Sequence, residues 1–297
     1  MRRFVAISEE VGQALAERRA VVALETTLVA HGFPPGEGVE VGLESERRVR
    51  EAGGVPATIG VLDGEIRVGL TAEELGRFGP DARKIGPRDL AAAVVQHAVG
   101  ATTVGGTLAA CRAAGIGFMG TGGLGGVHRG FPSPPDVSAD LAELVRTEAL
   151  VVSSGVKSIL DVPATAELLE TLGVPVLGFR TDDLPLFYTA HGGPPVSGRV
   201  ESAEEAARIA HTHWGLGRAT SVLLARPASD SLDDVEPLIE RALVDAAAQG
   251  VSGQGVTPFV LAYLHRESDG RTLAANRDLI ADNAALAAEV AVAYASL

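Results

Sequence analysis

The alternation of short apolar runs with amphipathic helices is the feature that most constrains the fold of this chain. Runs of strand length occur as AVVALETT (residues 20–27), ALVVSSG (149–155), VPVLGF (174–179) and SVLLARP (221–227), and amphipathic patterns such as SEEVGQALAERR (8–19) accompany them. Strands that are apolar throughout and alternate with helices are typical of sheets covered by helices. The pattern therefore predicts an α/β fold.

Two regions depart from this alternation. The stretch PATIGVLDGEIRVGL (residues 56–70) places Asp63 and Gly64 between two β-rich runs, which predicts an antiparallel hairpin beside the βα units. From residue 233 to the C-terminus the patterns are mostly helical. Neither an internal repeat nor a linker interrupts the sequence, so we expect residues 1–297 to form a single domain.

Net charge and cysteine content limit the binding partners and the cellular compartment that we expect for this protein. The formal net charge of -13 opposes nonspecific binding to nucleic acid and to anionic membranes, which carry the same sign. Cys111 is the only cysteine, and the sequence contains neither a signal peptide nor a run of ~20 apolar residues. We therefore expect a cytoplasmic protein that binds a small molecule, with no nucleic-acid and no membrane partner. A phosphorylated substrate would need a locally positive pocket in this acidic molecule.

Lysine is almost absent from the chain. Of the 25 basic residues, 23 are arginines, and the two lysines are Lys84 and Lys157. Arginine can replace lysine at most solvated positions, but a desolvated lysine can lose its proton and attack a carbonyl carbon. Lys157 has apolar neighbours in VVSSGVKSILD and is predicted to lie between a strand and the following helix, where burial and the helix N-terminus would lower the pKa of its amine. A Schiff base with a sugar aldehyde is one role for Lys157, and a solvated lysine at a helix start is the alternative.

Glu25 and Lys84 are candidates for an acid and an anion-binding group. Glu25 ends the apolar run AVVALE, where a buried carboxylate must be paired, coordinated or protonated. It could act as a general acid or as the structural partner of an arginine. Lys84 lies with Arg88 in KIGPR, a predicted loop before a helix capped by Asp89, and this place suits an anion. A solvated loop charge is the alternative for Lys84.

Two further segments combine small and polar residues. Seven glycines lie within residues 115–126, where they either let the backbone approach a ligand or form a tight connection. His128 follows them and could donate to a phosphate or a base. The segment DVSAD presents Asp136 and Asp140 around Ser138, and these oxygens could bind a hard divalent cation through water or cap the next helix.

Taken together, these segments resemble the pseudouridine-5'-phosphate glycosidase family, which also includes proteins named for synthesis of the pigment indigoidine. The resemblance covers nearly the whole chain and rests on ALETTLVAHGFP, PATIGVLDGEIRVGL, KIGPRDL, ATTVGGT, TGGLGGVHRG, DVSADL, VVSSGVKSILD, GQGVTPFVLAYL and LAANRDLIADNAALAAEVA, in the family's order. The chain departs from the family pattern in PSPP, directly before Asp136, where members usually have fewer prolines.

The resemblance implies a three-layer α/β/α sandwich around a mostly parallel, mixed sheet, assembled as a homotrimer. It also implies reversible cleavage of the C–C glycosidic bond between C1′ of ribose 5-phosphate and C5 of uracil, with one divalent cation per subunit, usually Mn²⁺. By the same resemblance, Lys157 is the covalent nucleophile, Glu25 the proton donor and Asp136 the metal ligand. The substrate-binding positions that it implies are Lys84, Thr103, Val104, His128, Ser138, Ala139, Asp140 and Asn276.

The chemistry of such a substrate agrees with a lysine nucleophile. A C–C bond to uracil has no heteroatom that can be protonated, so hydrolysis by two carboxylates is poorly matched. An imine at C1′ of the opened ribose can act as an electron sink while an acid protonates uracil C5. Two alternatives stay open. A Schiff-base aldolase acting on a phosphosugar would need no uracil pocket, and a noncatalytic metabolite-sensing module would bind ligand without turnover.

Overall fold

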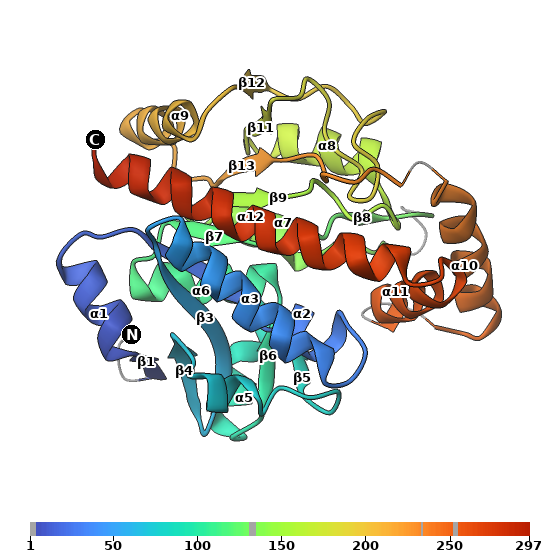
Figure 1. The fold of residues 1–297 in the computed structure, drawn as a ribbon, viewed down its shortest axis with the longest axis horizontal. Coiled ribbons are helices and arrows are strands. Elements are labelled where there is room, and N and C mark those ends of the chain that lie inside the picture. Colours follow the sequence, from blue (N-terminus) through green and yellow to red (C-terminus); the bar gives the residue numbers. More distant parts are fainter. Residues whose placement is uncertain (1–3, 131–134, 233, 252–254) are drawn as a thin grey trace.

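The computed structural model describes residues 4–130, 135–232, 234–251 and 255–297. Its elements along the chain (Figure 1) are β1 (Val5–Ile7), α1 (Glu9–Ala16), β2 (Val21–Glu25), α2 (Thr27–His31), α3 (Glu37–Glu51), β3 (Val55–Leu62), β4 (Glu65–Val68), α4 (Ala72–Leu75), β5 (Arg83–Ile85), the 3-10 helix η2 (Pro87–Asp89), α5 (Leu90–Val95), β6 (Gly100–Thr102), α6 (Val104–Ala114), β7 (Phe118–Gly120), β8 (Val127–His128), α7 (Ala139–Leu144), β9 (Leu150–Ser153), β10 (Leu160–Asp161), α8 (Val162–Thr171), β11 (Val176–Phe179), β12 (Gly198–Val200), α9 (Ala203–Gly215), β13 (Val222–Ala225), α10 (Glu236–Ala248), α11 (Val256–Glu267) and α12 (Arg271–Ala295). None of the described helices is both long enough and apolar enough to cross a membrane.

A mixed, mostly parallel sheet forms the centre of the molecule. Within the described residues its strand order is β1-β4-β3-β2-β7-β9-β13-β11-β12, and β6 pairs with both β3 and β5 beside this path. The pairs from β3 through β2, β7, β9, β13 and β11 to β12 are all parallel, whereas β3 runs antiparallel to β4 and β6. Asp63 and Gly64 form the turn between β3 and β4 with positive φ angles of 52° and 82°. The predicted hairpin is thereby confirmed.

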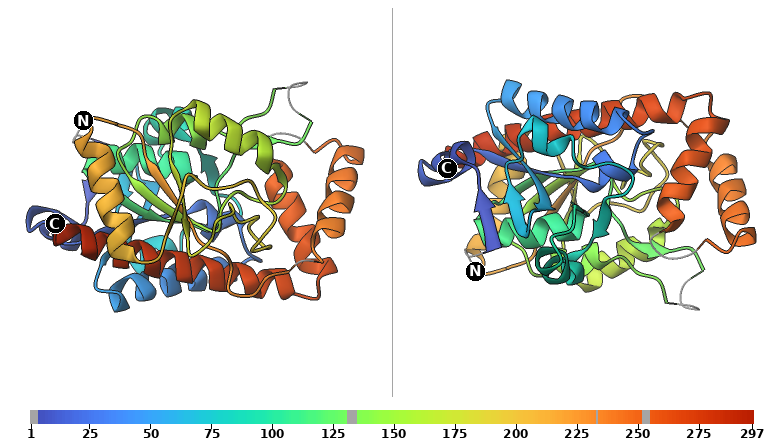
Figure 2. Two further views of the ribbon diagram at one scale, coloured as in Figure 1. Left: turned by 90° about the horizontal axis from the view of Figure 1, so that it is seen from above. Right: turned by 90° about the horizontal axis from the view of Figure 1, so that it is seen from below.

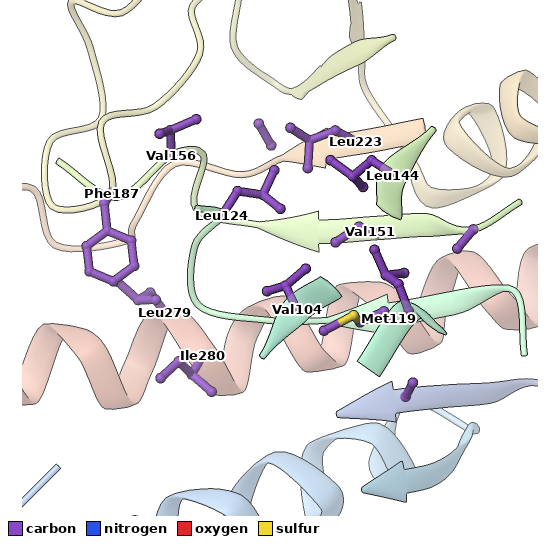
Figure 3. Close-up of a cluster of buried hydrophobic side chains, with 14 of the residues drawn as sticks. Val104, Met119, Leu124, Leu144, Val151, Val156, Phe187, Leu223, Leu279 and Ile280 are labelled. Carbon is purple, nitrogen blue, oxygen red and sulfur yellow. The ribbon is translucent and has the colours of Figure 1, made fainter. Parts of the chain in front are cut away.

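Successive strand residues face opposite sides of the sheet, and different helices cover the two sides (Figure 2). In β9, Val151 belongs to an apolar cluster with residues of α6, α7 and α8, part of which is drawn in Figure 3. Leu150 and Val152 belong to a second cluster with residues of α3, α9 and α12. Figure 1 shows α12 running along the sheet beside α3. This single-domain, three-layer α/β/α arrangement confirms the predicted fold class.

The carboxyl ends of the parallel strands meet at one edge of the sheet. There β2 ends at Glu25, β7 is followed by residues 121–126, and β9 is followed by residues 154–159. The predicted helical C-terminal region is confirmed, because α10 and α11 pack on each other and lead into α12 (Figure 1). Open α/β sheets bind ligands at this edge, since loops of independent sequence converge there.

Three threonine hydroxyls attach β6 to the same edge. The hydroxyls of Thr26 and Thr102 both donate to the carbonyl oxygen of Ile59, at 2.8 and 2.7 Å. The amide of Thr102 donates to Oγ1 of Thr26 at 2.9 Å, and the hydroxyl of Thr107 donates to Oγ1 of Thr102 at 3.0 Å. Because β6 is antiparallel to β3, these bonds hold the carboxyl end of β6 near the carboxyl end of β2. The start of α6, which follows β6, is therefore also placed there.

The secondary structure expected around the two lysines is partly wrong. Lys84 lies within the short strand β5 and not in a loop. Asp89 is the N-cap residue of α5, as expected, but its side chain makes no cap bond there and accepts instead from the amide of Gly86 at 3.0 Å. Lys157 does not precede a helix directly, because α8 begins only at Val162, where Asp161 caps it. An apolar run does not reveal where a helix begins, since strand and helix both accept Val, Ile and Leu.

The glycine-rich region is also more regular than its composition predicts. Residues Phe118–Gly120 form β7, a central strand that pairs with β2 and β9, so the connection begins only at residue 121. Helix α12 lies directly against this strand at Gly120 and leaves no room there for a side chain. A Cβ at Gly120 would lie 2.9 Å from Cα of Ala284, which is closer than side chains pack.

Candidate active site

All site residues named from the sequence line two adjoining cavities at the carboxyl edge of the sheet. The cavities, called here the polar cavity (about 410 Å³) and the apolar cavity (about 60 Å³), have a common wall formed by Glu25, Thr27, Lys84, Lys157 and Thr257. The polar cavity is also lined by Thr103, Val104, His128 and residues 136–140. The apolar cavity is also lined by His31, Phe33, Phe187, Leu261, Asn276 and Ile280.

Glu25 is a buried carboxyl group at the end of β2. It is 6 % exposed, and its Oε1 accepts a hydrogen bond from the hydroxyl of Thr121. Burial raises the pKa of Glu25, while the Lys157 amine and the Thr121 hydroxyl act in the opposite direction. Within the described part of the chain no arginine pairs with Glu25. A carboxyl group with a raised pKa keeps its proton to higher pH, which suits a proton donor.

Lys157 reaches the common wall from the loop between β9 and β10. Its amide donates to the carbonyl oxygen of Leu124 at 3.1 Å, and its side chain is partly buried. A Cβ at Gly123 would lie 2.6 Å from the ring of Phe187 and 3.4 Å from Cγ of Lys157. Glycine at position 123 therefore leaves the space in which the lysine stem and the phenyl ring pack.

Lys84 approaches the same wall from β5. Burial lowers the pKa of its amine, and the positive charge of Lys157 adds to this effect, while Asp140 and Glu25 oppose it. Arg88 lines the polar cavity as well. A chain with a net charge of -13 thus gathers both of its lysines and an arginine at one cavity. Because four acidic side chains line the same cavity, these basic groups offer a phosphate local contacts within a lining of mixed charge.

The DVSAD segment both caps a helix and joins two backbones. Oγ of Ser138 accepts from the amide of Asp140 at 3.2 Å, so Ser138 is the N-cap of α7, as expected. The carboxylate of Asp140 is buried and accepts from the amides of Gly105 at 2.8 Å and Gly125 at 3.0 Å. Asp140 therefore fixes the start of α6 against the glycine-rich loop. Ala139, the residue between Ser138 and Asp140, also lines the polar cavity.

Thr103 and Val104 form the start of α6 at the wall of the polar cavity. Oγ1 of Thr103 accepts from the amide of Gly106 at 3.2 Å, which makes Thr103 the N-cap. Val104 is buried and is one of the side chains labelled in Figure 3. These two residues shape the wall, and their contact with a substrate stays a prediction.

His128 and Asp136 lie at the outer side of the polar cavity. Nδ1 of His128 is 3.7 Å from Oδ2 of Asp136, and the Asp136 side chain is 40 % exposed. Burial lowers the pKa of His128 while Asp136 opposes this effect, so the imidazole is mainly neutral near pH 7. Residues 132–134 of the PSPP segment lie outside the described residues.

The predicted metal site has few protein ligands. Among the described residues no group of three or more His, Cys, Asp or Glu side chains could hold a metal ion. Asp136 offers one partly exposed carboxylate and His128 a nearby ring nitrogen. Hard divalent cations such as Mn²⁺ and Mg²⁺ are often held through one or two carboxylates and keep several water ligands. The residues present fit this mode of binding.

Sequence reasoning missed most of the apolar cavity. Nε2 of His31 is buried and has no hydrogen-bond partner among the described residues, and the same is true of Oδ1 of Asn276. Burial lowers the pKa of His31, while a hydrogen bond to the backbone of Ala82 opposes this effect. A neutral imidazole has one donor and one acceptor nitrogen, and Nε2 is the acceptor of the tautomer that donates through Nδ1. Outside the common wall, the cavity therefore has two acceptors on otherwise apolar walls.

Fold and site together define a class: a three-layer α/β protein with a buried carboxyl group and two lysines around a small-molecule cavity at the carboxyl edge of its sheet. The chain belongs to the family described as indigoidine synthase A like protein, whose model matches residues 10–293. This agrees with the resemblance seen in the sequence motifs.

The similarity to named relatives and to solved structures extends over nearly the whole chain. Proteins named pseudouridine-5'-phosphate glycosidase include one from Caldanaerobacter subterraneus subsp. tengcongensis, 44% identical over 98% of this chain and 97% of its own, and one from Streptomyces griseus subsp. griseus, 48% identical over 97% and 92%. An indigoidine synthase A-like protein from Thermotoga maritima has a TM-score of 0.87 at 37% identity, covering 98% of this chain and 97% of its own. A prealnumycin C-glycosynthase solved in complex with ribulose 5-phosphate has a TM-score of 0.89 at 39% identity, covering 99% and 98%.

Proposed function

We propose that the protein is an enzyme that cleaves the C–C glycosidic bond of pseudouridine 5'-phosphate, reversibly, to uracil and ribose 5-phosphate, through a Schiff base on Lys157. The observation that carries the proposal is that Lys157 and the buried Glu25 line one cavity, in a chain whose relatives bear the name of this activity. The structural neighbour in complex with ribulose 5-phosphate supports a pentose phosphate as the sugar part.

The proposed reaction uses Lys157 as nucleophile and Glu25 as acid. The neutral amine of Lys157 bonds to C1′, and the ring oxygen leaves with the bonding electron pair and takes up a proton, which opens the ribose ring. The nitrogen loses a proton, and its lone pair then forms the C=N bond as the C1′–C5 bond breaks. Glu25 delivers a proton to C5 of uracil in place of the sugar carbon. Water adds to the imine, and ribose 5-phosphate leaves Lys157.

The two cavities suggest where the two halves of the substrate bind. The polar cavity, with Lys84 and Arg88, suits the phosphate and the ribose hydroxyls. The apolar cavity suits the base, because uracil linked through C5 keeps both ring N–H groups. The acceptors on His31 and Asn276 have no partner among the described residues and match these donors. Binding energy from the remote phosphate would help to position the sugar for ring opening.

A divalent cation at Asp136 is part of the proposal. Such an ion, held by Asp136 beside His128, would organise water and substrate oxygens and offset negative charge. We expect Mn²⁺ to bind the parent protein, and Asp136→Asn to weaken that binding at least about 10-fold. Titration calorimetry with Mn²⁺ alone measures the binding without any turnover. Unchanged affinity in Asp136→Asn would place the ion elsewhere.

Borohydride reduction in the presence of ribose 5-phosphate tests covalency, substrate class and site together. Mass spectrometry of the parent protein should find one sugar adduct on Lys157, and Lys157→Ala should carry none. Lys84→Ala is the matched control and should still form the adduct. An adduct on Lys84 would reject the division of roles between the lysines.

Release of free uracil from pseudouridine 5'-phosphate tests the reaction itself. Cleavage of a phosphorylated aldol substrate without uracil release would favour the aldolase alternative. Ligand binding without any turnover would favour the metabolite-sensing alternative.

The homotrimer and the cytoplasmic location stay predictions that the family resemblance and the composition support. Light scattering coupled to size exclusion should give three times the chain mass of 30.5 kDa. A mass of one chain would contradict the trimer.

A further inference from the structure

Asn283 on α12 holds two loops of the candidate site with one side-chain amide. It is 0 % exposed, and its Nδ2 donates to the carbonyl oxygen of Thr121 at 2.9 Å and to Oγ of Ser154 at 3.0 Å. A longer contact of 3.4 Å reaches the carbonyl oxygen of Gly122. The close approach of α12 to β7 at Gly120 places this amide at the carboxyl edge of the sheet.

One of the two loops contacts the proposed acid at the end of β2, and the other carries the proposed nucleophile. Thr121 donates its hydroxyl hydrogen to Glu25, and its amide donates to the carbonyl oxygen of Val152 at 3.0 Å. Ser154 lies three residues before Lys157, and its amide donates to the carbonyl oxygen of Gly122 at 2.8 Å. The Asn283 amide thus bonds the segment that contacts Glu25 to the segment that leads to Lys157.

Backbone bonds carry this connection along both loops to Lys157. The amide of Leu124 donates to the carbonyl oxygen of Gly155 at 3.0 Å, and the amide of Lys157 donates to the carbonyl oxygen of Leu124 at 3.1 Å. Leu124 and Val156 also form an isolated parallel bridge. The loops therefore form one paired ribbon, with Asn283 at the end nearer the sheet and Lys157 at the other.

The surroundings fix the orientation of the Asn283 amide. Its NH₂ group faces three acceptors, whereas a flipped amide would place its carbonyl oxygen against the two backbone oxygens. Oδ1 of Asn283 is buried and has no partner among the described residues, so the bonds made by Nδ2 are what hold the side chain. A buried donor set of this kind resists displacement, because leaving the acceptors unpaired is costly.

We propose that Asn283 is a positioning residue of the active site, which sets the relative placement of Glu25 and Lys157 through Thr121 and Ser154. It is absent from the lining of both cavities, so it is proposed to act through other residues. The inference rests on the function proposed above, because that function requires the acid and the amine to reach the same sugar and base.

Kinetics of Asn283→Ala test this role. We expect kcat for uracil release to fall about 10- to 100-fold, since small misplacements of reacting groups cost this much, while KM changes little. The basic limb of the pH profile should move to higher pH, because the Thr121 hydroxyl, which lowers the pKa of Glu25, is no longer held in place. A merely structural role predicts an unchanged kcat per folded molecule and an unchanged profile.

A double-mutant cycle with Thr121→Val tests whether Asn283 acts on the active site through Thr121. If Asn283 acts through Thr121, the double variant should lose clearly less than the product of the two single losses. Losses that multiply fully would overturn the proposal. Leu286→Ala, a buried change in the same helix that lies in the second apolar cluster, is the control for stability. It should lower Tm and keep kcat, and an equal fall of kcat in this variant would also reject the proposal.

Two further measurements keep the test decisive. If Asn283→Ala does not fold, Ser154→Ala removes one acceptor of the same amide, and we expect a fall of kcat of about 3- to 10-fold. An unchanged kcat in Ser154→Ala would then overturn the inference. A parent protein that releases no uracil rejects the proposed function and this inference with it. A parent that releases uracil beside an equally active Asn283→Ala rejects the inference alone.

Discussion

The polar and the apolar cavity have a common wall but are built differently. The polar cavity is lined by helix starts and loops that follow the strands, and its side chains include Lys84, Arg88 and Asp136. The apolar cavity is lined by side chains of α2, α11 and α12 and by Phe187, and outside the common wall its polar groups are neutral acceptors on His31 and Asn276. The first can hold charge and the second can hold a flat base.

This difference suggests a division of work in which the cavities bind and only their common wall performs chemistry. Glu25 and Lys157 face both cavities, so a substrate that fills both would place its scissile bond between them. Changes at Glu25 and Lys157 should then lower kcat, whereas changes at the other residues that line the cavities should affect one half of the substrate.

The largest effect is expected for Lys157→Ala. Removing the nucleophile should lower kcat for uracil release by about 10⁴-fold or more, since the other amine of the wall, Lys84, is assigned to the phosphate and not to C1′. Calorimetry should still detect binding of ribose 5-phosphate in the polar cavity, with thermal unfolding as the check on the fold. Turnover above a hundredth of the parent rate would refute the role of Lys157.

Glu25→Gln should have the next largest effect. Loss of the proton donor is expected to reduce kcat by about 10²- to 10⁴-fold. Burial raises the pKa of Glu25, so in the parent the acid remains protonated above its usual range and kcat falls as pH rises through the raised pKa. The pH–rate profile of Glu25→Gln should lack this basic limb. A basic limb that persists in the variant would assign the proton donor to another group.

Lys84→Ala separates the polar cavity from the apolar one. In the reverse reaction we expect KM for ribose 5-phosphate to rise about 10- to 100-fold, while KM for uracil stays the same. Because burial lowers the pKa of Lys84, its charge is lost at lower pH than for a free lysine. The parent's KM for the phosphate should therefore rise with pH, and that of the variant should not. A parallel rise of both KM values would show that the two cavities do not act separately.

His31→Phe gives the smallest expected effect and the reciprocal pattern. Loss of one neutral acceptor in the apolar cavity should raise KM for uracil about 5-fold and leave KM for ribose 5-phosphate unchanged. Steady-state kinetics of the reverse reaction with each substrate varied in turn measures both values. A selective rise in the KM for ribose 5-phosphate would place the sugar, not the base, beside His31.

The polar cavity was predictable because its residues occur in compact motifs. Lys84, the residues of DVSAD and Lys157 each stand in a short segment whose composition is unusual for a solvated loop. The apolar cavity was not predictable, because residues such as Phe33, Phe187 and Ile280 have the composition of any core and lie far apart in the chain. Asn276 and Asn283 show the same limit. They lie seven residues apart on one helix, but the sequence alone could not tell which one reaches the loops.

The sequence by itself determined the alternation of strands and helices, the hairpin at Asp63 and Gly64, and the reactive groups available to the chain. These follow from periodicity and side-chain chemistry, which are local properties. Only the tertiary structure decided that Lys84 lies in a strand, that Lys157 lies before a short strand and not at a helix start, and that both meet Glu25 at one wall. Burial and proximity determine the pKa values and the shape of a site, and both arise from segments that are distant along the chain.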